Sequence, residues 1–440
     1  MTFVLSRRLV GDLPVTVLEM PHLHSVTIAF SVRGGPRHEP PSANGVSHML
    51  EHLMLRGTEA RRDSYTLSAA IESLGGDVNG LTQRDAMTLH LTVPATSAVE
   101  GVRILGEIVT TPLLAGLDIE RNVVLEEILD TLDHRGRETD PDALSRLTLW
   151  AGHPLGLPVA GTRATVAALT EDDCRAQYET LVAASNGVLS VAGPVNGDQI
   201  FTEASEAFAS LRRGRRLVSP TPLDLSEKPP IQLQSTDDAQ VSLLFTYPAP
   251  HENDPEFPAL LMLRRLLDDG FASRLRQAVC ETRGLAYSVG ASVDAYEDAG
   301  AFDVELSCTP DKVSEVAKVV VETLESVGSF GLSDEELLRI RARHAADVAF
   351  SRDDPAEMVA WYASSELLGA SGTFESRAAR ATQVEPAQIA SLAARVFSRD
   401  RCLLTLVGPA RKGLRDLERL LGRPARSSRG LGGARRARRE

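Results

Sequence analysis

Residues 45–58 read GVSHMLEHLMLRGT, and this stretch decides how the rest of the chain is interpreted. Its spacing predicts a helix on which His48 and His52, four residues apart, project from one face. Glu51 directly precedes the second histidine. Two neutral imidazoles on adjacent turns can chelate one divalent ion, and a carboxylate beside them can accept a proton from a metal-bound water. The alternative is an unrelated pair of helical histidines near a glutamate, so the surrounding sequence has to decide.

A third metal ligand is expected from a second acidic helix, LDIERNVVLEEILDTLD, residues 117–133. Glu120 and Glu127 lie seven residues apart and therefore share one face of that helix. Apolar residues lie between them, so the helix is expected to be half buried, and a buried glutamate must be paired or bound to a ligand. We assign Glu127 to the metal and Glu120 to a supporting position behind it. Glu126 points elsewhere and is expected to be solvated.

The pattern HMLEH, followed 75 residues after its last histidine by Glu127, resembles the pitrilysin/insulysin family of zinc metallopeptidases. Within the family, the chain is most similar to the processing-peptidase branch, whose subunits have about this size. The resemblance extends over nearly the whole chain. It implies a Zn²⁺ cofactor with His48, His52 and Glu127 as metal ligands, Glu51 as the catalytic general base and Glu120 as a supporting carboxylate in catalysis.

Residues 74–93, LGGDVNGLTQRDAMTLHLTV, resemble the family pattern GGxxNAxTxRExTxYY. Asn79 and Thr82 match this pattern, and Gly80 stands where the family has alanine. The resemblance implies that the segment borders the substrate cleft, with Asn79 and Thr82 as substrate-binding residues. In such a cleft an extended peptide is held by backbone pairing with a sheet edge, which tolerates many side chains.

Length and composition describe an ordinary globular protein. The 440 residues suggest two domains, and the apolar content of 43% with 24% charged residues is typical of soluble chains. No apolar run approaches the ~20 residues of a membrane span, and the N-terminus does not resemble a signal peptide. Four scattered cysteines without CxxC spacing are expected to be reduced thiols, which favours a cytoplasmic location and excludes a thiolate zinc site.

The charge is unevenly distributed. Residues 426–440 contain six arginines and one glutamate, a charge of about +5. Because the net charge of the whole chain is −13, the rest of the chain carries about −18. The Gly/Arg/Ser composition of this tail predicts disorder. The acidic body would repel phosphates and lacks a basic aromatic surface, which argues against nucleic-acid binding. An acidic cleft would favour basic peptides.

Weak internal repetition indicates a tandem pair of one fold. SVTIAFSVRGG (25–35) resembles QVSLLFTYPAP (240–250), and residues 85–109 resemble residues 300–324 at the same offset of about 215. The strand and helix patterns predict an α+β fold of two homologous domains, each a mainly antiparallel sheet with helices on one face. The resemblance implies that each forms half of a clamshell chamber. The expected domains are 1–212 with the zinc site, a linker at 213–232, a metal-free domain at 233–425, and the tail at 426–440.

The second half contains FASRLRQAVCETRGLAYSVGA, residues 271–291, where many family members carry R-E-x-x-G-L-A-Y. In the family an arginine and a tyrosine at this spacing hold the substrate carbonyl. Tyr287 matches, whereas Cys280 stands at the arginine position, and a thiol cannot replace a guanidinium. The departure favours a heterodimer in which a related, zinc-less subunit supplies the Arg–Tyr pair. The alternatives are a homodimer with a weakened oxyanion contact and a non-catalytic peptide-binding or assembly subunit.

Overall fold

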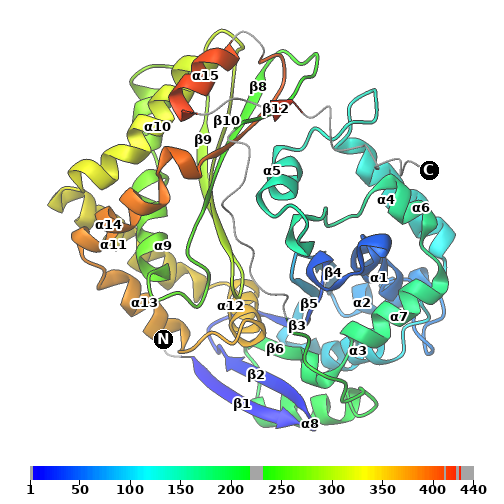
Figure 1. Cartoon of the computed structure of the whole chain (residues 1–440). Helices are drawn as coiled ribbons and strands as arrows, with labels where there is room; N and C mark the ends of the chain where they lie inside the picture. The colour runs from blue at the N-terminus through cyan, green and yellow to red at the C-terminus, as the bar shows by residue number, and fades with distance from the viewer. Residues whose placement is uncertain (1–2, 219–230, 411–412, 423–425, 428–440) are drawn as a thin grey trace, which may run out of the picture. The chain divides into compact units, whose positions relative to one another are not determined.

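The structure is a computed structural model that describes residues 3–218, 231–410, 413–422 and 426–427 (Figure 1). Two compact units divide the chain. Unit 1 comprises residues 1–130, 152–221 and 345–378, and unit 2 comprises 131–151, 222–344 and 379–440. The domains predicted from the sequence follow the chain order, whereas each compact unit combines three separate segments. Residues 219–230 of the predicted linker and 428–440 of the predicted tail lie outside the described residues.

Unit 1 contains a six-stranded sheet in the order β1-β2-β6-β3-β5-β4. All neighbouring strands are antiparallel except β2 and β6. Its strands are β1 (Val4–Val10), β2 (Leu13–Glu19), β3 (Ser25–Arg33), β4 (Asp77–Thr82), β5 (Ala86–Pro94) and β6 (Gly187–Gly193). β4 is the last strand at one end of this order, so one of its edges faces away from the sheet.

Unit 2 contains a second six-stranded sheet, in the order β12-β7-β11-β8-β10-β9. Its strands are β7 (Ile231–Gln234), β8 (Val241–Pro248), β9 (Val289–Ala295), β10 (Gly300–Cys308), β11 (Leu403–Val407) and β12 (Arg426–Ser427). From β7 onward this order repeats that of unit 1 from β2 onward, with β8 in the place of β3 and β10 in the place of β5. The tandem α+β fold is therefore confirmed. Residues 426 and 427, predicted to be disordered, form β12 instead because they pair with β7.

The helices of unit 1 are α1 (Val46–Met54), α2 (Ser64–Ser73), α3 (Ala98–Thr110), α4 (Leu117–Asp130), α6 (Arg163–Ala168), α7 (Glu171–Leu181), α8 (Gly197–Ala207) and α12 (Pro355–Leu367). Those of unit 2 are α5 (Pro141–Leu149), α9 (Phe257–Leu267), the π-helical turn Arg276–Glu281, α10 (Val313–Phe330), α14 (Pro386–Val396) and α15 (Leu414–Leu421). The division between the units falls within α11 (Asp334–Ser351) and α13 (Phe374–Thr382). No described helix has the length and apolar composition that crossing a bilayer requires.

Helices cover both faces of the unit 1 sheet. α3 packs on the face that carries Ile28 and Leu91, where Gly101 lets the helix approach closely. α12 packs on β3 and β6 from the other face, beside Ala29 and with its own Met358 in the same buried cluster. The sequence pattern indicated only one helical layer, because α12 is contributed by a segment more than 150 residues after the last strand of the sheet.

Helix α5 is the counterpart of α12 in the first half of the chain. It packs on β8 and β11 of unit 2. Both helices begin with an Asp-Pro pair, and Asp140 accepts hydrogen bonds from the first-turn N–H groups of α5. Arg146 is the buried anchor of α5. Its guanidinium donates to Asp294 at 2.8 Å and to both carboxylate oxygens of Asp303, which also accepts from Thr246.

Replacing Arg146 with methionine should strongly destabilise the protein. The substitution would leave the Asp303 carboxylate buried without its countercharge, and breaking a buried pair in this way costs about 3–5 kcal/mol. Urea unfolding of the variant measures this loss. The control is Arg419→Met, which removes a solvent-exposed pair with Asp416 and should change the free energy of unfolding by under ~1 kcal/mol. Equal effects of the two substitutions would contradict the role given to Arg146.

Candidate functional site

Helix α1 carries the H-x-x-E-H residues, and its N-terminus is fixed by backbone packing and a buried carboxylate. Gly45 precedes the helix with φ at 95°, and a Cβ there would lie 2.6 Å from the carbonyl oxygen of Ala160. Glu39 is buried, and its carboxylate accepts the N–H groups of Gly45 and Ser47, both at 2.8 Å. Since first-turn N–H groups have no partner within a helix, this carboxylate caps α1.

The structure brings the three predicted metal ligands together. His48 Nε2 lies 3.3 Å from His52 Nε2 and 3.8 Å from Glu127 Oε2, and the three ligand atoms all lie within 4.8 Å of one another. Two nitrogens bound to one tetrahedral zinc at 2.0–2.1 Å are about 3.3 Å apart. The spacing and the donor set of two imidazoles and one carboxylate therefore fit Zn²⁺.

His48 is held in the neutral form that a metal ligand requires. Burial lowers the pKa of His48 to about 4, and protonation of the neighbouring His52 would lower it further. The Nδ1 atom of His48 is buried without a hydrogen-bond partner among the described residues. At neutral pH few protons compete with a cation for this imidazole.

This shift predicts a pH-dependent stability of the metal-free protein. The unfolded chain, with a histidine pKa near 6.5, binds more protons than the folded chain, so the free energy of unfolding falls as the pH drops from 6.5 to about 4. The loss due to His48 should be about 3 kcal/mol. Denaturant unfolding at pH 7 and pH 4 should show it in the unaltered protein and in His134→Gln, an exposed control, but not in His48→Gln. An identical pH dependence in all three proteins would contradict the assignment.

The second histidine is oriented by a carboxylate behind it. Glu120 Oε2 lies 2.9 Å from His52 Nδ1, and Glu120 Oε1 lies 3.1 Å from Arg56 Nη1. A proton on Nδ1 is thereby donated to Glu120, which leaves the Nε2 lone pair directed to the metal side. Glu120 therefore lies behind the second histidine, and its supporting role in catalysis stays a prediction.

Glu51 lies on the same helix but turns its carboxylate toward strand β4. Its Oε2 accepts a hydrogen bond from the Thr82 hydroxyl. Burial raises the pKa of Glu51, whereas the Thr82 hydrogen bond opposes that rise, as protonation of His52 would. A carboxylate whose pKa is shifted upward binds a proton more readily at working pH, as general bases do.

Like Glu127, the predicted substrate-binding residues Asn79 and Tyr287 are exposed. Asn79 is exposed on β4, where its side-chain oxygen accepts the N–H of Gly80. Tyr287 belongs to unit 2 and is 92% exposed. Cys280 is half-buried in the π-helical turn. Arg276 begins that turn and donates to the Tyr287 carbonyl at 3.1 Å while paired with Glu281.

Two contributors to the site were not found from the sequence. Glu39 lies in an irregular segment, and nothing in its spacing indicates that it returns to cap α1. Arg56 stands four residues after His52, and this helical spacing was the available signal for its position beside the Glu120 carboxylate.

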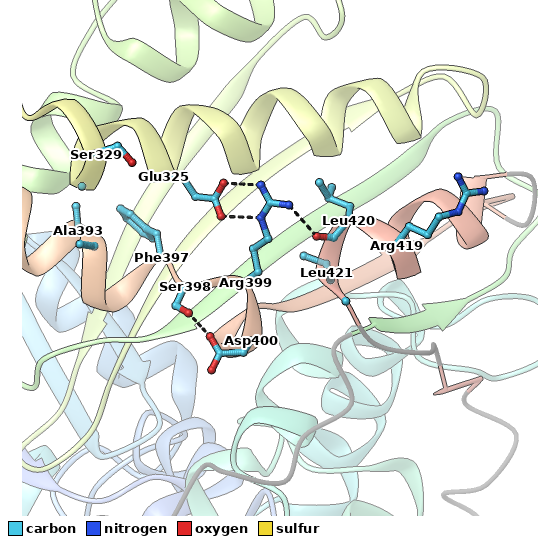
Figure 2. A pocket seen from close by; sticks show the side chains of 13 residues that line it. Glu325, Ser329, Ala393, Phe397, Ser398, Arg399, Asp400, Arg419, Leu420 and Leu421 are labelled. Carbon is cyan, nitrogen blue, oxygen red and sulfur yellow. Dashed lines mark hydrogen bonds and ion pairs between the residues drawn. The ribbon is translucent and has the colours of Figure 1, made fainter.

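Unit 2 also contains a pocket of about 740 Å³ between α10, α14 and α15 (Figure 2). The Arg399 guanidinium on its wall already has hydrogen-bond partners within the pocket lining. It forms two hydrogen bonds of 2.6 Å with Glu325 and a third with the Leu420 carbonyl. The metal cluster, in contrast, presents three ligand atoms to a common point. We therefore take the cluster as the functional site.

Comparisons with known proteins relate the chain to zinc proteases. Residues 15–163 match the family model "Insulinase (Peptidase family M16)", and residues 168–343 match "Peptidase M16 inactive domain". A relative described as an uncharacterized zinc protease of Streptomyces coelicolor is 29% identical over 415 residues, 91% of this chain and 88% of its own length. Another, of Mycobacterium leprae, is 31% identical over 335 residues, 74% of each chain.

Solved structures share the fold. The crystal structure of a peptidase M16 inactive domain from Pseudomonas fluorescens superposes with a TM-score of 0.84 over 92% of this chain and 98% of its own, at 19% identity. At this identity the likeness shows the fold alone. The predicted metal ligands lie within residues 15–163, which match the insulinase model, and residues 168–343 match the domain described as inactive.

Proposed function

Because the chain belongs to the insulinase-type peptidase family M16, we propose that it is a zinc-dependent endopeptidase that cleaves peptides or unfolded segments. One observation carries the proposal: three ligand atoms from α1 and α4 converge beside a buried carboxylate on α1. The relatives described as zinc proteases support it.

The residues of the site have separate roles in this proposal. A zinc ion held by His48, His52 and Glu127 would polarise the substrate carbonyl and lower the pKa of a water ligand to about 7. Glu51 takes the proton from the attacking water and passes it to the leaving amine. Glu120 holds His52 in the tautomer that binds metal.

We place the substrate along strand β4. This strand ends the sheet order, so its free edge can pair with an extended peptide through the main chain. The exposed Asn79 is then available to a substrate. A peptide bound in this way is recognised mainly by its backbone, which suits a broad peptidase or the removal of leader peptides.

We further propose that this chain is the catalytic subunit of a heterodimer. The guanidinium of Arg276 lies beside Tyr287 but is paired with Glu281, and Cys280 carries no charge, so this chain's own Arg–Tyr pair is incomplete. A related, zinc-less subunit would supply the complete pair. The four cysteines are free thiols, which supports a cytoplasmic location.

Hydrolysis of fluorogenic peptides, measured with and without a zinc chelator, tests the function. We expect chelation to abolish hydrolysis and added zinc to restore it. The assay is then repeated with a co-encoded related chain that lacks H-x-x-E-H. Activity that appears only in the mixture supports the heterodimer, and full activity of this chain alone supports a homodimer. Bound zinc without hydrolysis in either format would contradict the peptidase and favour a peptide-binding subunit.

A further inference from the structure

The general base lies against the edge strand of the unit 1 sheet. α1 contacts β4, and the two elements lie side by side in Figure 1. Successive residues of a strand point to opposite faces, so Gly80 and Thr82 share one face of β4. Thr82 is 9% exposed and Glu51 is 8% exposed, and the Thr82 hydroxyl donates to Glu51 Oε2. The carboxylate is therefore enclosed by this face of the strand.

Gly80 provides the space that the Glu51 side chain occupies. A Cβ added at Gly80 would lie 2.4 Å from Cγ, 2.5 Å from Oε1 and 2.7 Å from Cδ of Glu51. These distances are far below van der Waals contact, and all three atoms belong to one side chain. Alanine at this position would force the flexible Glu51 side chain away from its observed place, so a family member with alanine here would have to hold its glutamate elsewhere.

We propose that Thr82 and Gly80 together position Glu51 for catalysis: Thr82 by holding the carboxylate with its hydroxyl, and Gly80 by leaving room for it. The inference rests on the proposed peptidase function. It gives Thr82 a role different from the substrate binding that the family pattern suggests, because its hydroxyl is already bound to Glu51. Asn79 differs from Thr82, since its side chain is exposed on the opposite face of β4.

Steady-state kinetics of Thr82→Val, Thr82→Ser and Gly80→Ala test the proposal. Loss of a hydrogen bond to a charged group should lower kcat by about 10–100-fold in Thr82→Val, with unchanged KM and zinc content. Thr82→Ser keeps the hydroxyl and should retain kcat within about threefold. Gly80→Ala should lower kcat to about the level of Thr82→Val. The double variant should be no slower than the slower single variant, because both substitutions act through Glu51.

The matched control is Gly290→Ala, in edge strand β9 of unit 2. A Cβ there would lie 3.6 Å from Glu305, an ordinary contact, so kcat and the melting temperature should not change. A readout that needs no activity is a double-mutant cycle of Thr82→Val and Glu51→Gln on the melting temperature of the metal-free protein. The melting-temperature shift of the double variant should be smaller than the sum of the shifts of the two single variants.

Unchanged kcat in both Thr82→Val and Gly80→Ala would overturn the proposal and leave the peptidase intact. So would a rise in KM at constant kcat in Thr82→Val, which is the result expected of a substrate-binding residue, or additive shifts in melting temperature. Absence of zinc-dependent hydrolysis by the unaltered protein would instead overturn the proposed function. The melting-temperature cycle would still test whether Thr82 holds Glu51.

Discussion

In the Glu51→Gln variant we expect kcat for peptide hydrolysis to fall by about 10²–10⁴-fold while the zinc content stays that of the unaltered protein. The amide has nearly the shape of the carboxylate but cannot accept the proton of the attacking water. Glu51 is not one of the three clustered ligands, so its replacement leaves the metal donors in place. Peptide hydrolysis and metal analysis on the same preparation provide the measurement.

The matched control for this variant is Glu72→Gln on α2, an exposed glutamate of the same unit. It makes the same change of charge and should retain the kcat of the unaltered protein. If Glu51→Gln cleaves peptides as fast as this control, Glu51 is not the base. If it loses both cleavage and zinc, the substitution has disturbed the metal ligands, and Glu51 has a structural role.

Glu127→Ala should remove the metal and, with it, the hydrolysis of peptides. The substitution leaves two imidazoles of α1, which cannot complete a structured site. We expect zinc affinity to fall by more than the ~10–100-fold that is typical when a residue behind a ligand is lost. Competition with a fluorescent zinc chelator measures this affinity.

Variants of two other glutamates on α4 make the experiment specific to Glu127. Glu126→Ala changes the adjacent exposed glutamate and should bind zinc like the unaltered protein. Glu120→Ala removes the partner of His52 Nδ1, so its zinc affinity should fall between the other two. Zinc affinity in Glu127→Ala equal to that in Glu126→Ala would remove Glu127 from the ligand set.

The local part of the site could be predicted from the sequence. The four-residue spacing of His48 and His52 fixes their common face in any helix, and the seven-residue spacing of Glu120 and Glu127 does the same for α4. Residues that enter from irregular segments could not be found this way. Glu39 caps α1 through a fold of the chain that no periodicity encodes.

The fold likewise has a part that could be predicted from the sequence and a part that could not. The repeated segments predicted two related sheets, and their strand orders agree. The placement of α5 and α12 was not predictable from local pattern, because each helix packs on strands far away in the sequence. In unit 2 the π-helical turn ends at Glu281, and Tyr287 follows in irregular chain. Helical spacing therefore does not predict that Arg276 donates to the Tyr287 carbonyl.

The most direct test of the metal centre is anomalous diffraction at the zinc absorption edge from crystals of the protein grown with zinc. The structure predicts one anomalous peak bonded to His48 Nε2, His52 Nε2 and a carboxylate oxygen of Glu127, at about 2.0–2.2 Å. A peak bonded to other residues, or no peak between α1 and α4 at saturating zinc, would contradict the metal centre and the peptidase built on it.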